Sequence, residues 1–157
     1  MQRITPFLWF NHEAEEAAAF YTAIFQDSKI GRIVRCGDAG PGPKGSALTV
    51  AFELAGQEFV GLNGGPHFTF NEAISFVVNC ESQAEVDSFW ERLSAGGQPS
   101  CGCWLKDKFG VSWQVVPTAL PRLLADPDPQ KTQRVMQALM QMQKVDIRRL
   151  EQAAAGQ

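Results

Sequence analysis

Residues 4–26 read ITPFLWFNHEAEEAAAFYTAIFQ, a short aromatic run followed at once by an acidic helical pattern. Aromatic residues favour strands, so the run up to Phe10 predicts a strand, and Asn11 is a residue type that caps helix N-termini. The helix dipole favours anions in the first turn, where this stretch places Glu13, Glu15 and Glu16. Apolar residues then recur at helical spacing and predict a helix over residues 12–26: Ala17, Phe20, Tyr21 and Ile24.

The same order recurs in residues 72–94, EAISFVVNCESQAEVDSFWERLS. Residues 72–79 have the composition of a strand, and Ser82 with Glu85 forms the capping-box pattern that opens a helix, here to about Ser94. The aromatic pair Phe89-Trp90 takes the place that Phe20-Tyr21 holds in the first copy. The chain therefore contains an internal repeat.

More strands follow each helix. In the first copy, residues 29–36 resemble a strand, residues 47–54 alternate cleanly between large and small or polar side chains, and Ala55-Gly56 predicts a hairpin turn into a strand over residues 58–63. In the second copy the strands fall near residues 101–105 and 111–116. This order predicts an α+β fold in which the second sheet face is covered by the other copy, a partner chain or a ligand.

The C-terminal tail has a different pattern. Asp128 and Pro129 mark the start of a helix, and Asp146 caps a last short helix through Leu150. The first of these helices has an apolar stripe of Val135, Leu139 and Met142, which Met136 and Met140 are expected to widen, so the tail should pack on its own barrel or on a second subunit.

Composition excludes several classes of function. The chain has 157 residues, which suits one domain or two small halves that share a core. Fourteen basic residues against seventeen acidic ones give no cationic field, so we expect no nucleic-acid partner, and no apolar run is long enough for a membrane helix. The four cysteines lack the spacing of a zinc or redox motif, which predicts reduced thiols and a cytoplasmic protein.

Few residues have the pattern of catalytic chemistry. The glycine-rich residues 37–45 lead into a strand, whereas a phosphate loop leads into a helix. The two histidines, His12 and His67, are isolated from other metal-ligand types in the sequence. What remains is a set of aromatic and amide side chains that either line a ligand pocket or form an ordinary core: Trp9, Asn63, Phe70, Asn71, Trp104, Trp113 and Gln114.

Several longer strings resemble one family: NGGP at 63–66, FNEAISF at 70–76, WLKDKFG at 104–110, SWQVVP at 112–117 and the tail from Asp126. They are similar to the PhnB-like branch of the glyoxalase/bleomycin-resistance/extradiol-dioxygenase (vicinal oxygen chelate) superfamily, often labelled 3-demethylubiquinone-9 3-methyltransferase domain. The resemblance implies two βαβββ modules, the second shortened, that form an open mixed-sheet barrel around a pocket in a homodimer. It divides the chain into modules at 1–66 and 67–117 and a helical tail at 118–157.

The resemblance also implies positions for a divalent metal, and this chain departs from them. They fall at Thr5 or Pro6, near Ala73, and at Gln114, of which only the last is a weak ligand. We therefore predict no metal and no cofactor. The methyltransferase label has no donor-binding loop to support it in these residues and is interpreted as an inherited name.

The sequence thus predicts a protein of the glyoxalase-like fold that binds a small molecule, without a metal. Its ligand-binding residues are predicted to be Trp9, Asn63, His67, Asn71, Trp104 and Gln114. The alternative is an enzyme of the superfamily, lyase-, transferase- or dioxygenase-like, with His67 as the base. A third hypothesis is a structural dimer that uses the methionine-rich tail as its interface.

Overall fold

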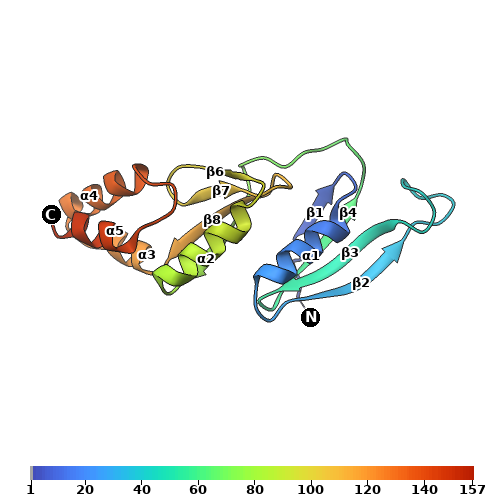
Figure 1. Ribbon diagram of the computed structural model, residues 1–157, viewed down its shortest axis with the longest axis horizontal. Helices are drawn as coiled ribbons and strands as arrows, with labels where there is room; N and C mark the ends of the chain where they lie inside the picture. Colours follow the sequence, from blue (N-terminus) through green and yellow to red (C-terminus); the bar gives the residue numbers. More distant parts are fainter. Residues whose placement is uncertain (1) are drawn as a thin grey trace. The chain divides into compact units, whose positions relative to one another are not determined.

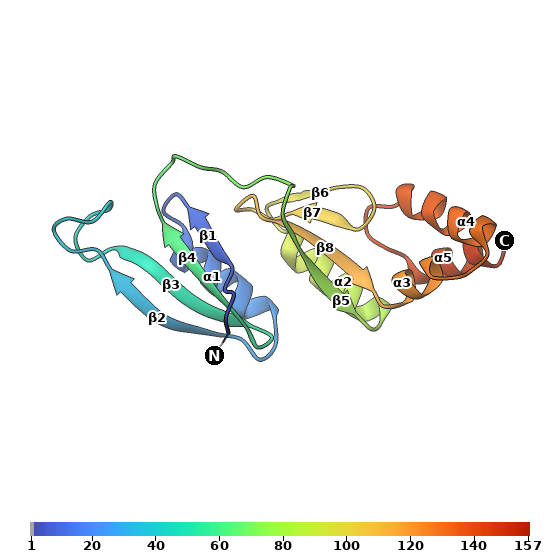
Figure 2. The same cartoon turned by 180° about the vertical axis from the view of Figure 1, so that it is seen from behind.

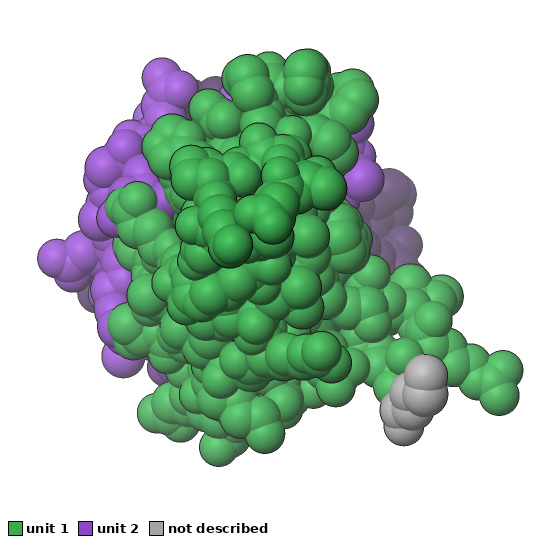
Figure 3. Space-filling view, turned by 90° about the vertical axis from the view of Figure 1, so that its right-hand side faces the viewer, with its two compact units in different colours: residues 1–70 green, residues 71–157 purple. Residues whose placement is uncertain are grey.

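The computed structural model describes residues 2–157, and the chain forms two compact units. One unit ends at Phe70, and the other spans Asn71–Gln157 (Figure 3). Within residues 2–157, no helix is long and apolar enough to cross a membrane.

The first unit is a βαβββ module. It contains β1 (Phe7–Phe10), α1 (Ala14–Ile24), β2 (Lys29–Arg35), β3 (Ala47–Leu54) and β4 (Gln57–Asn63). The sheet has the strand order β1-β4-β3-β2, with β1 parallel to β4 and the other neighbours antiparallel (Figure 1). The helix connects two strands that lie at opposite edges of the sheet, which places it across one face.

The core of this unit lies between α1 and that face of the sheet. The buried side of α1 consists of Ala14, Ala17, Ala18, Tyr21 and Ile24. Three residues of the predicted stripe are therefore buried, whereas the fourth, Phe20, is only half-buried. The large residues of the alternation in β3 face the helix, and the ring of Tyr21 stacks on Phe52 at 6.0 Å between centroids. Phe52 in turn stacks on Phe59 of β4.

The second unit repeats this topology with shorter strands. It contains β5 (Ser75–Cys80), α2 (Gln83–Ser94), β6 (Gln98–Pro99), β7 (Trp104–Lys106) and β8 (Ser112–Pro117), in the order β5-β8-β7-β6. Ser82 caps α2 as predicted, because its hydroxyl accepts from the Glu85 amide at 3.2 Å. The return bond of the predicted capping box is shifted by one residue, since the Glu85 carboxylate accepts from the amide of Glu81 and not from that of Ser82. The predicted α+β class with two βαβββ modules is therefore confirmed.

Three C-terminal helices belong to the second unit: α3 (Ala119–Leu124), α4 (Pro129–Met140) and α5 (Ile147–Ala154). Asp128 and Asp146 cap α4 and α5 as predicted. The helices are joined to the rest of the unit by Gln83, whose side chain donates to the Val145 carbonyl at 2.9 Å and accepts from the Ile147 amide at 2.8 Å. The amide of Gly102 also donates to the Met142 carbonyl.

Two local predictions are wrong. Asn11 does not cap α1: the N-cap residue is Glu13 without a side-chain bond, and the amide of Ala14 is instead bound by Asn63. Met136 and Met140 do not widen the buried stripe of α4, since both are exposed while Val135 and Leu139 are buried. The buried stripe of α4 is therefore narrower than predicted.

Each sheet keeps one face free of the helix of its own module. Figure 2 shows the sheets from the side opposite α1 and α2, and among the described residues of each unit no helix lies across this face. Strand alternation directs to it the side chains that the helices do not bury.

Candidate functional site

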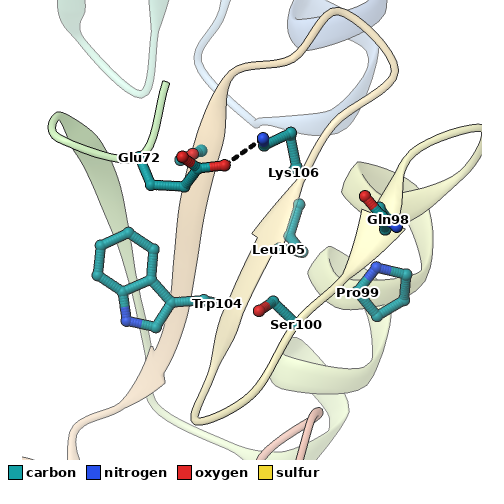
Figure 4. A pocket seen from close by; sticks show the side chains of 8 residues that line it. Glu72, Gln98, Pro99, Ser100, Trp104, Leu105 and Lys106 are labelled. Atoms are coloured by element: carbon teal, nitrogen blue, oxygen red, sulfur yellow. Dashed lines mark ion pairs between the residues drawn. The ribbon is translucent and has the colours of Figure 1, made fainter. Parts of the chain in front are cut away.

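A cavity of about 510 Å³ lies on the second module (Figure 4). Glu72, Gln98, Ser100, Trp104, Lys106 and Ser112 are among the residues that line it. Ligand-binding pockets have volumes of roughly 300–1,000 Å³, so this cavity is large enough for a small molecule. A second cavity of about 400 Å³, with Lys29, Glu53 and Glu58 in its wall, lies on the first module.

Strand register explains how the first cavity acquires its side chains. Trp104 and Lys106 are two residues apart on β7, so both point to the same face of the sheet. Their register partners on β8 are Gln114 and Ser112, and Ser75 of β5 pairs with Ser112 from the other side. The uncovered face of three neighbouring strands therefore presents one aromatic ring among several polar groups.

Lys106 and Glu72 form an ion pair at one end of the cavity (Figure 4). Glu72 lies in the turn before β5, where the Asn71 side chain accepts a hydrogen bond from the Ala73 amide at 2.9 Å and so fixes the turn. The hydrogen bond from Lys106 is the main reason that the pKa of Glu72 lies below its usual value. The Glu72 carboxylate is thus ionised at neutral pH, so any other anion has to compete with it for the Lys106 ammonium group.

Ser112 is the unusual member of this group. Its side chain is 2% exposed, and within residues 2–157 its hydroxyl has no hydrogen-bond partner although it lines the cavity. An unsatisfied buried hydroxyl costs about 1–3 kcal/mol, so native proteins rarely keep one without a reason. A ligand that bonds to this hydroxyl would remove that cost.

Gln114 is held by polar contacts next to the cavity. Its Nε2 donates to the Ser75 hydroxyl at 2.9 Å, and its Oε1 accepts a weak bond from the Cys103 thiol at 3.9 Å. Burial raises the pKa of the Cys103 thiol to about 11, so the thiol stays protonated and acts as a donor, not as a nucleophile. The amide is therefore fixed in orientation beside Trp104.

The other predicted site residues lie in the first module. The Trp9 indole donates to the Gly65 carbonyl at 2.9 Å and contacts the edge of Phe68, while His67 is exposed in the same segment. Asn63 uses both ends of its amide within the module: Oδ1 accepts from Ala14 and Nδ2 donates to the Ala47 carbonyl.

Of the predicted residues, Trp104 and Gln114 are brought together as register partners, and Asn71 shapes the turn that carries Glu72. Sequence reasoning missed Lys106 and Glu72. The available signal was the two-residue spacing of Trp104 and Lys106, but the predicted strand ended at residue 105, one residue before Lys106.

The residues at the family's metal positions do not fit a divalent metal. Thr5, Pro6 and Ala73 offer no strong ligand, and the Gln114 amide is already bonded to Ser75 and Cys103. Within residues 2–157, no three His, Cys, Asp or Glu side chains gather in a group that could hold a metal ion. No chemistry through a protein-held metal is therefore assigned to this site.

Two βαβββ modules, each with one sheet face that its own helix does not cover, define the glyoxalase-like, or vicinal oxygen chelate, class of protein. The chain belongs to the PhnB-like family of this class, because the family model described as 3-demethylubiquinone-9 3-methyltransferase matches residues 2–116.

Solved structures agree with this assignment. The chain is 39% identical to the PhnB protein of Bacillus cereus, with a TM-score of 0.69, over 74% of this chain and 100% of that one. Protein PA1353 of Pseudomonas aeruginosa is 21% identical, with a TM-score of 0.61, over 74% and 98% of the two chains. The fosfomycin resistance protein FosX of Listeria monocytogenes shares the fold at 18% identity and a TM-score of 0.56, over 80% and 98%. No curated protein matches the chain.

Proposed function

We propose that this protein binds a small organic molecule in the cavity on the second module. The observation that carries the proposal is the buried Ser112 hydroxyl without a partner in the wall of a 510 Å³ cavity. The indole of Trp104 supplies an apolar wall, and a few placed polar groups supply orientation, which is the usual composition of a ligand site.

Among the predicted ligand-binding residues, we assign contact with the ligand to Trp104 and support of the site to Gln114 and Asn71. Trp9 and His67 are not among the residues that line the two cavities, so we propose no ligand contact for them. Asn63 is given a structural role because both ends of its amide are bonded. Among the described residues His67 has no partner that would position it as a base, so we favour binding over catalysis.

We also propose that binding takes place without a protein-held metal. The donor types at the family's metal positions support this, since an amide alone is a weak ligand. The methyl transfer named in the family description is not proposed for this chain. Residues 37–45, the glycine-rich segment, lead into β3, whereas a donor-binding loop leads into a helix.

Exposed apolar side chains support a homodimer. Ile4, Phe7, Ile74 and Met140 are each more than half exposed. Light scattering on the full chain should give twice the chain mass, and Phe7→Lys compared with Met140→Lys distinguishes a sheet interface from a tail interface.

The four free cysteines support a reducing compartment such as the cytoplasm.

The binding function is tested by native mass spectrometry of untagged protein, purified without a chelator, together with ligand-detected NMR of an aromatic fragment mixture. We expect a non-covalent adduct or NMR binding signals that are lost in Trp104→Ala and kept in Trp9→Ala. One divalent metal per chain would contradict the metal-free proposal. Fragments that bind equally to Trp104→Ala would place the site elsewhere.

A further inference from the structure

The polar groups of the second-module cavity differ in how firmly they are held. Lys106 lies within β7, and its side chain is 36% exposed, whereas Glu72 lies on the turn before β5 and is 63% exposed. Because the cation is part of the sheet and the carboxylate is on a more exposed turn, the carboxylate is the partner that can be exchanged. Removing Glu72 would leave an ammonium group and the Ser112 hydroxyl, both of which can donate hydrogen bonds.

We propose that this cavity takes the carboxylate of a small aromatic acid, bound by Lys106 and Ser112, and that the Glu72 carboxylate competes with this acid for Lys106 in the structure described here. The inference rests on the proposed binding function and names its ligand class. Ser112 is the register partner of Lys106, so one carboxylate is able to reach both donors from neighbouring strands. A carboxylate oxygen would also satisfy the buried hydroxyl that has no partner in the described residues.

Trp104 is the reason that we expect the ligand to contain an aromatic ring. It lies two residues before Lys106 on the same strand, which separates the indole from the ammonium-bearing residue by roughly 7 Å along the sheet. An acid whose carboxylate is one or two bonds away from a planar ring matches this spacing. The ring would then lie against the indole while the carboxylate replaces that of Glu72.

The first module provides a comparison. Its cavity also contains a Lys–Glu pair, Lys29 with Glu53, but these two residues are direct register partners on β2 and β3. Both charged residues therefore lie in strands of the sheet, and neither lies on an exposed turn as Glu72 does. In residues 2–157, the buried unsatisfied hydroxyl belongs to the second module. These differences favour the second cavity for an acid.

Calorimetry on the full chain with 1-naphthaleneacetate, its neutral amide and 1-naphthaleneethylamine tests the inference. We expect the acid to bind at least about tenfold more tightly than the amide, the factor typical of one hydrogen bond to a charged group. Lys106→Met should abolish this preference and Ser112→Ala should weaken acid binding. Glu72→Gln should tighten acid binding several-fold, because the internal competitor is removed. Lys29→Met is the matched control and should leave the affinity unchanged.

Each other result contradicts a defined part of the inference. An amide or amine that binds as tightly as the acid overturns the ligand class while the binding function stands. Weaker acid binding by Glu72→Gln overturns the role of Glu72 as a competitor for Lys106. If none of the three probes binds, the ligand class is wrong, while the proposed cavity stands or falls with the loss of fragment binding in Trp104→Ala.

Discussion

Asn63, the last residue of β4, joins the first turn of α1 to the start of β3. Its Oδ1 accepts from the Ala14 amide at 2.8 Å, and its Nδ2 donates to the Ala47 carbonyl at 3.1 Å. We expect Asn63→Ala to lower the free energy of unfolding by about 1–2 kcal/mol, as the loss of a helix cap does, measured by urea denaturation. Asn63→Asp keeps the acceptor and should lose less.

Asn11→Ala is the matched control, since Asn11 is exposed and does not cap the helix. Its unfolding free energy should change by less than about 0.5 kcal/mol. Equal losses in the two variants would contradict the assignment of the cap to Asn63. Sequence reasoning chose Asn11 because it precedes the helix, but the residue that binds Ala14 lies 49 positions away and is brought there only by the parallel pairing of β1 with β4.

Asp107 is a buried carboxylate that holds the turn between β7 and β8. It accepts hydrogen bonds from the amides of Phe109 and Val111 and from the Trp113 indole. In Asp107→Asn the amide nitrogen cannot accept, so a buried N–H loses its partner, and we expect a loss of about 3 kcal/mol in urea unfolding. Asp38→Asn, on the surface, should stay within about 0.5 kcal/mol. A loss below 1 kcal/mol for Asp107→Asn would contradict this role.

At the scale of elements, Arg134 of α4 holds the end of α5. Its guanidinium donates to the carbonyls of Ala153 and Ala154 at 2.9 and 2.8 Å, where the helix dipole is negative. We expect Arg134→Met to speed amide hydrogen exchange in Ile147–Ala154 about tenfold or more, the factor for one charged hydrogen bond. Arg148→Met, an exposed position on α5 itself, is the control. Equal exchange in both variants would contradict this role of Arg134.

The hairpin between β3 and β4 carries a strained residue that can be improved. Ala55 has a φ of 49° and Gly56 a φ of 82°, the backbone of a turn that prefers Asn-Gly. We expect Ala55→Asn to raise the free energy of unfolding by about 0.5–1 kcal/mol in thermal denaturation. Gly56→Ala should lower it by a similar amount. A destabilised Ala55→Asn variant would contradict the turn assignment.

Three strands show where a sequence pattern is sufficient to predict the bounds of an element and where it is not. Strand β3 was predicted at its observed bounds because its alternation extends over the whole strand. Strand β6 was not predicted, since the two residues Gln98–Pro99 have no periodicity. The strand predicted at residues 101–105 starts later, at Trp104, because Gly102 and Cys103 adopt left-handed backbone angles of 68° and 78°.

At the scale of the whole molecule, the repeat was predictable but the site was only partly so. The strand–helix repeat predicted the topology that both sheets share. Trp104 and Gln114 were identified by their aromatic and amide side chains, whereas the contact of Lys106 with Glu72 joins a strand to a turn. Such a contact depends on tertiary placement, and so does the absence of a partner for Ser112 within residues 2–157. Sequence patterns predict which face of a strand or helix a side chain occupies, but they do not predict which other residues it contacts there.

The division of the chain into two units predicts where a protease cuts first. Phe68 lies between β4 and β5, next to the boundary at Phe70, and is 64% exposed. Limited digestion with chymotrypsin should therefore cleave first after Phe68 and yield two fragments by mass spectrometry. Phe7 is also exposed but is paired with Val60 in the sheet, so cleavage there should be slower. Phe68→Ser should delay the first cut, whereas a first cut after Phe7 would mean that the edge of the first sheet opens before the connecting segment does.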